Sequence, residues 1–135
     1  MLCSASLVPP GKIPDLWAEV CPLLEPAIDM TGGRMSSATV FSGLALAQYH
    51  LWLLKDESIR AAGVTEFRHY PTGLRTLAAL LVGGSDMRDW SHLWADVEVW
   101  AKQQGCAKVE LSGRRGWSRV LGWKETMIDM EKDLI

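Results

Sequence analysis

The segment from Asp89 to Leu121 constrains the fold of this chain more than any other, because two helical patterns enclose a strand pattern. Through residues 90–101 the apolar positions recur at helical spacing, and Gly105 stands where such a helix would end. Residues 108–111 then alternate between polar and apolar, as a strand does, and residues 113–121 begin a second, shorter helix. This order predicts a layered fold that mixes helices with a sheet, of the α/β or α+β class.

Three apolar runs precede that segment and are separated by short polar turns. They cover residues 49–54, 59–70 and 75–82, and short turns between strands predict an antiparallel meander. Gly63 interrupts the second run, where we expect a β-bulge. Residues 77–82 are continuously apolar, which is typical of a strand covered on both faces near the centre of a sheet.

The two ends of the chain supply the remaining predicted elements. Residues 5–9 fit a short edge strand, and the apolar stripe of residues 16–28 fits a helix that Pro22 and Pro26 kink or divide into two. Ser36 or Ser37 can cap the next helix. Its expected buried face consists of Val40, Phe41, Leu44 and Ala47. Residues 123–134 can form one long final strand.

Composition excludes several classes of protein. The 14 basic and 16 acidic residues nearly cancel, which gives no electrostatic reason to expect nucleic acid as a partner. The three cysteines are odd in number and widely spaced, so neither a disulfide framework nor, with the three histidines, a metal site is predicted. The apolar runs are too short to span a membrane. We therefore expect a soluble, cytoplasmic protein that forms one domain over residues 1–135.

The order of predicted elements, together with residues 97–106, 109–111 and 113–123, resembles the GNAT-type N-acetyltransferase fold. Thr31-Gly32-Gly33 and Leu51-Trp52 extend the likeness, which is to small GNAT-like proteins encoded by tailed bacteriophages. The resemblance implies a mixed, mostly antiparallel, twisted sheet with helices on both faces. It also implies acetyl-CoA as the cofactor of active members, and a location in the host cytoplasm or the virion.

The same resemblance points to where a cofactor would bind. GNAT enzymes hold the CoA pyrophosphate on backbone N–H groups at the start of their central helix, through a turn of the form Q/R-x-x-G-x-G/A, which is anion binding at a helix N-terminus. That pattern is absent from residues 83–90, where Asp86 and Asp89 add negative charge at the expected phosphate position. The cofactor-binding candidates are therefore Leu81, Gly83, Gly84, Ser85 and Arg88.

The catalytic candidates are few. A GNAT enzyme needs a base for the amine proton and an acid for the thiolate. Glu66 and His69 are the titratable residues of the predicted meander nearest the expected site, although their odd spacing sends them to opposite faces of a regular strand. The helix at residues 115–121 lacks the usual tyrosine and offers only Ser118 as an acid.

These observations lead to three hypotheses about function. The first is a GNAT-fold, phage-type protein that is non-catalytic or weakly active, binds no cofactor, and acts as a binding or virion-assembly component with phage structural proteins or with itself. The alternative is an active acetyl-CoA-dependent N-acetyltransferase that acts on a small or protein amine. The third is a weak nucleic-acid binder that uses Arg114, Arg115 and Arg119.

Overall fold

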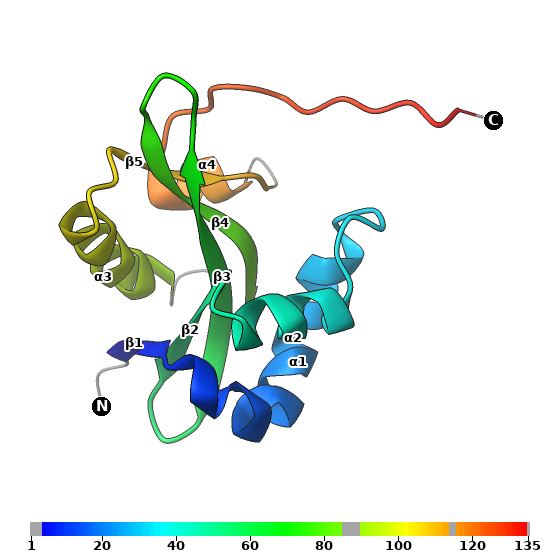
Figure 1. Cartoon of the computed structure of the whole chain (residues 1–135), viewed down its shortest axis with the longest axis vertical. Coiled ribbons are helices and arrows are strands. Elements are labelled where there is room, and N and C mark those ends of the chain that lie inside the picture. The colour runs from blue at the N-terminus through cyan, green and yellow to red at the C-terminus, as the bar shows by residue number, and fades with distance from the viewer. Residues whose placement is uncertain (1–3, 85–89, 114–115, 135) are drawn as a thin grey trace.

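The computed structural model describes residues 4–84, 90–113 and 116–134, which form a five-stranded sheet with helices on both of its faces (Figure 1). A single turn of 3-10 helix, Pro10–Lys12, leads into the first helix. The elements in chain order are β1 (Ser4–Val8), α1 (Ile13–Asp29), α2 (Ser37–Ala45), β2 (His50–Lys55), β3 (Ile59–His69), β4 (Arg75–Gly84), α3 (Trp90–Gln103), β5 (Lys108–Leu111) and α4 (Gly116–Leu121).

The strands lie side by side in their chain order, β1-β2-β3-β4-β5. The first three pairings are antiparallel, and β5 pairs with β4 in parallel. The parallel pair is possible because α3 carries the chain back across one face of the sheet before β5 begins. The predicted meander, the edge position of the first strand and the interior position of residues 77–82 are therefore confirmed.

Two separate hydrophobic cores cover the two faces of the sheet. Helices α1 and α2 cover one face, and α3 and α4 cover the other. Strand β2 contributes to both because its side chains alternate: Leu51 and Leu53 face α1, whereas Trp52 and Leu54 face α3. This arrangement confirms the predicted fold class.

Helix α1 is one continuous helix from Ile13 to Asp29, although it contains Pro22 and Pro26. Both prolines lie on its exposed side, where water can satisfy the carbonyl groups that lose an N–H partner. The buried positions of α1 follow helical spacing: Ile13, Val20, Leu24 and Ile28.

Helix α2 begins as predicted, with the side chain of Ser36 accepting a hydrogen bond from the Thr39 N–H. Its buried positions include Val40 and Leu44, and Phe41 is partly buried. The expectation for Ala47 was wrong, because Ala47 lies beyond the end of α2, is exposed and has a positive φ of 59°.

Helix α3 turns Trp94, Val97 and Ala101 into the second core, as its periodicity predicts. Beyond its last turn, Gly105 has φ 82°, a left-handed conformation that glycine adopts without strain. The described part of the chain contains no helix that is long and apolar enough to cross a membrane.

Two sequence predictions about strands were wrong. Gly63 keeps regular register between Trp52 and Val82. The register shifts lie on either side of it: Arg60 is the extra residue opposite Leu54–Lys55, and Leu80 of β4 is the extra residue opposite Val64–Thr65. Residues 122–134 contain no strand; they leave the sheet as an extended segment (Figure 1). Alternating side chains make a strand only where a neighbouring strand supplies hydrogen bonds, and this segment has none in the described structure.

Candidate functional site at the split between β4 and β5

The sheet splits where β5 ends. Strand β5 pairs with β4 only from Thr76 to Ala79, whereas β4 continues to Gly84. On the side of β4 that faces β5, the main chain of residues 80–84 has no strand partner in the described structure. An open run of N–H and C=O groups can pair with another extended molecule, as an added strand does. The split therefore fits a ligand that carries amide groups along an extended arm.

The bulge at Leu80 lies at the same point as the split. Ala79 is the last residue of β4 that pairs with β5, and Leu80 is the extra residue opposite β3. A bulge leaves one residue outside the regular ladder and redirects the strand. At this position, the ladder between β4 and β3 is therefore interrupted and the pairing of β4 with β5 ends.

The glycines that follow the bulge have a packing role of their own. A Cβ atom on Gly83 would lie 1.9 Å from the carbonyl oxygen of Leu23 in α1, and one on Gly84 would lie 2.6 Å from the Cβ of Ala61. Glycine is thus required here so that α1 can approach the sheet closely. Leu81 is buried in the core beneath α1, so these three candidates can offer a ligand main-chain groups only. Ser85 and Arg88, like Asp86 and Asp89, lie outside the described residues.

A polar group occupies the sheet face on the α1 side, next to the split. The cross-strand register aligns Glu66 of β3, Ala78 of β4 and Glu110 of β5. The two carboxylates therefore flank a residue whose side chain is a single methyl group. Arg68 donates to Oε1 of Glu66 at 3.3 Å and lies 3.9 Å from Oε2 of Glu110. This face combines two acids with one shared cation.

Glu110 is held in place through one of its two oxygens. Its Oε2 accepts hydrogen bonds from the hydroxyl groups of Tyr70, at 2.9 Å, and Thr76, at 3.1 Å. None of the described contacts fixes Oε1 of Glu110, which is free to take a proton from a bound molecule or a water. Sequence reasoning missed Glu110, because only the parallel pairing with β4 places it opposite Ala78, within hydrogen-bond reach of Thr76.

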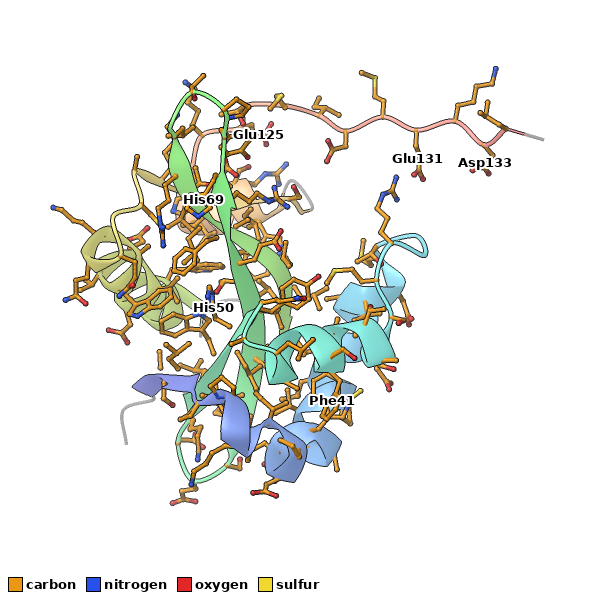
Figure 2. All side chains as sticks on the ribbon, in the orientation of Figure 1. Phe41, His50, His69, Glu125, Glu131 and Asp133 are labelled. Carbon is orange, nitrogen blue, oxygen red and sulfur yellow. The ribbon has the colours of Figure 1, made fainter. Side chains whose placement is uncertain are left out.

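The structure does not bring the three predicted catalytic residues together. Glu66 lies beside the split, whereas His69 is exposed at the far end of β3, opposite Arg75 (Figure 2). Phe67 belongs to the α3 core and Glu66 to the other face, so the odd spacing of Glu66 and His69 places them on opposite faces. Ser118 in α4 donates to Oε1 of Glu125 at 2.8 Å. Of the three, Glu66 alone adjoins the split.

A chain of hydrogen bonds stabilises the opposite face. Trp52 donates to Oγ1 of Thr65 at 3.0 Å, and the same oxygen lies 2.9 Å from Nδ1 of His50. The indole N–H donates to this oxygen, so the Thr65 hydroxyl keeps its own proton and can donate it to Nδ1 of a neutral imidazole. Burial lowers the pKa of His50, and the ring packs against Phe67 and Trp100. This group stabilises the core and does not reach the split.

A hollow of about 410 Å³ lies at the junction of α1 and α2, lined by Glu25, Ile28, Asp29, Gly33, Met35, Ser36 and Ser37. Two carboxylates on its wall would favour a cation. No group of three or more metal-ligating side chains occurs in the described ranges.

Arg119 is exposed on α4, and Arg114 and Arg115 lie outside the described residues, so the nucleic-acid hypothesis stays a prediction.

Comparison of the whole fold with solved structures identifies its class. An aminoglycoside acetyltransferase from an uncultured soil metagenomic sample, solved with sisomicin, superposes with a TM-score of 0.72 at 10% identity, covering 98% of this chain and 97% of the other. A putative acetyltransferase from Pyrococcus furiosus gives 0.69 at 16% identity, covering 97% and 100%. A predicted acetyltransferase from Clostridium acetobutylicum, solved with acetyl-CoA, gives 0.64 at 14% identity, covering 98% and 96%.

The chain therefore has the GNAT acetyltransferase fold over nearly its whole length. No protein-family model and no curated protein sequence matches it. The resemblance to phage proteins stays a prediction, and none of the three structures above is described as a virion component, so that expected role gains no support from them.

Proposed function

We propose that this protein is an acetyl-CoA-dependent N-acetyltransferase, the alternative that the sequence left open. The observation that carries the proposal is the coincidence of the β4 bulge with the end of the β4–β5 pairing. Together they leave an unpaired main-chain edge at residues 80–84 on a sheet of GNAT type, which we call the slot. The pantetheine arm of coenzyme A is extended and contains two amides, so it suits such a slot.

Residues of this chain would hold the cofactor mainly through the backbone. Residues 80–84 offer their free edge to the amides of the arm. The bulge leaves Leu80 outside the ladder between β3 and β4, so its main-chain N–H would be a candidate donor to the thioester carbonyl oxygen. When bound, acetyl-CoA would supply an activated acetyl group, which would pass to the amine nitrogen with the CoA thiolate as leaving group.

Glu110 is the residue that we assign to the amine proton. An amine is protonated near neutral pH and must lose a proton before it can attack. Oε2 of Glu110 is fixed by Tyr70 and Thr76, so its other oxygen is positioned to receive that proton, directly or through water. Arg68 and Glu66 then act as positioning residues, because Arg68 ties the two carboxylates to one face of the sheet.

A turnover assay with purified protein tests this assignment. Release of free thiol from acetyl-CoA would be followed with a panel of polyamine, aminoglycoside and peptide amines. We expect Glu110→Gln to lower kcat/KM by about 100-fold or more, because a general base contributes on the order of 10²–10⁴ in rate. Glu19→Gln, at an exposed position of α1, serves as the matched control and should retain full activity.

The proposal would be overturned by the absence of both acetyl-CoA binding at millimolar concentration and thiol release with any amine of the panel. Acetyl transfer that Glu110→Gln leaves unchanged would overturn the role assigned to Glu110 but not the acetyltransferase assignment.

A further inference from the structure

An amine of the chain itself lies beside the carboxylate that we assign to the acceptor's proton. The cross-strand register places Lys108 of β5 opposite Thr76 of β4, one row away from Glu110, which lies opposite Ala78. Lys108 and Glu110 are two residues apart on one strand, so their side chains lie on the same face of the sheet. Val109, between them, joins the core under α3 on the other face.

The two basic residues of this face have different surroundings. Arg68 already contacts both carboxylates, since it donates to Glu66 at 3.3 Å and lies 3.9 Å from Oε2 of Glu110. By contrast, Lys108 is exposed, and none of the contacts described for the chain involves its ammonium group. Its flexible four-carbon stem is therefore free to carry the nitrogen across the face.

The nitrogen of Lys108 is within reach of both Glu110 and the start of the slot. Consecutive residues of a strand are about 3.3 Å apart, so Glu110 lies about 7 Å along the strand from Lys108, and the level of Ala79 lies about 10 Å along it. An extended lysine stem covers about two residues of that path. The remaining distance, to a thioester held at the Leu80 N–H, is close to the separation of about 3–3.5 Å between reacting atoms.

We propose that Lys108 is a site of self-acetylation, at which each chain acetylates its own side chain. The donor is acetyl-CoA, so this inference rests on the proposed function. Oε1 of Glu110 takes one proton from the ammonium group, and the neutral Nζ then attacks the thioester carbonyl carbon. The N–C bond forms and the C–S bond breaks, which leaves an amide on Lys108 and the thiolate of CoA. The proton on Glu110 passes to water, and the second proton of the nitrogen ends on the thiol.

Lys102 supplies the matched comparison. It is exposed as Lys108 is, but it lies on α3, which covers the other face of the sheet (Figure 1). The full chain would be incubated with acetyl-CoA and no added amine, and peptide mapping by mass spectrometry gives the rate constant of acetylation at each lysine. Spontaneous acetylation affects both lysines, whereas transfer at the slot affects Lys108 alone.

We expect Lys108 to be acetylated about tenfold faster than Lys102 or more, because proximity and a general base both accelerate the transfer. Its rate constant should not depend on protein concentration, since the reaction occurs within one chain. Glu110→Gln should lower the rate at Lys108 to that at Lys102. Equal rates at the two lysines, a rate constant that rises with protein concentration, or an excess at Lys108 that Glu110→Gln leaves unchanged would each overturn the proposal.

Thiol release with the panel of free amines separates this inference from the proposed function. A chain that acetylates a free amine but leaves Lys108 at the rate of Lys102 would overturn self-acetylation and leave the acetyltransferase assignment in place. A chain that acetylates neither would overturn both.

Discussion

The centre of the sheet and its β5 end differ in how completely they are covered. Strands β2, β3 and β4 each have a neighbour on both sides, and their buried residues join cores on both faces. By contrast, β5 has four residues and one neighbour, and the apolar residues that follow α4 are exposed. The difference indicates that the central strands supply most of the stability, and it places the proposed cofactor site at the end of the sheet that is least covered.

The largest expected effect compares the same substitution in the two regions. Leu24→Ala removes a fully buried side chain from the core under α1 and should lower the free energy of unfolding by about 3 kcal/mol. Leu134→Ala, at a site 93% exposed, should change it by less than about 0.5 kcal/mol. Urea denaturation measures both. A loss of more than about 1 kcal/mol for Leu134→Ala in the monomer would show that the segment packs on its own fold.

A somewhat smaller loss is expected where α1 meets the glycines of β4. Gly83→Ala places a methyl group against the Leu23 carbonyl, which cannot move without shifting the helix, and overpacking of this kind costs about 1–3 kcal/mol. Gly11→Ala is the matched control, since nothing lies within 4 Å of its added carbon. Thermal unfolding should show a lower midpoint for Gly83→Ala alone. Equal midpoints would mean that α1 does not rest on Gly83.

A pH effect is expected from the core under α3. Burial lowers the pKa of His50 below its value in the unfolded chain, so the unfolded state binds more protons as the pH falls below about 6.5. The free energy of unfolding should therefore decrease from pH 7 to pH 5. His50→Gln should reduce that slope, whereas His69→Gln, at an exposed position, should leave it unchanged. An unaltered slope in His50→Gln would assign the effect to another group.

The smallest effect concerns the link between the C-terminal segment and the loop after α1. Arg34 and Glu131 form an ion pair at 2.6 Å, but both side chains are about two-thirds exposed. Exposed pairs contribute little because water and salt screen them. Arg34→Ala should therefore leave the unfolding midpoint of the monomer unchanged within error. A clear decrease would indicate that this ion pair anchors the C-terminal segment to the rest of the chain.

The sequence predicts the periodic elements well and the irregular ones poorly. Helical spacing located α3 and its end at Gly105, and apolar runs located β2, β3 and β4. The bulge was misplaced because Leu80 stands in an uninterrupted apolar run, where nothing local distinguishes it. Residues 123–134 have a strand pattern, but a pattern does not supply a neighbouring strand.

The candidate site was predictable only in part, because some of its residues are brought together by pairing between strands that are distant in the sequence. Glu66 was identified from its place on the meander and does lie beside the split. Glu110 was missed, because its position depends on the register between β4 and β5, two strands separated by a helix. The glycines at the end of β4 were interpreted as allowing close approach of a ligand, whereas the structure shows that α1 occupies the space above Gly83.

Hydrogen exchange of the full chain with and without saturating acetyl-CoA tests the central claim most directly, namely that the split between β4 and β5 is a cofactor slot. If the cofactor binds there, the amides of residues 80–84 should exchange more slowly, with little change in β1 and β2. Unchanged exchange at residues 80–84 in the presence of millimolar acetyl-CoA, or protection confined to another part of the chain, would contradict it.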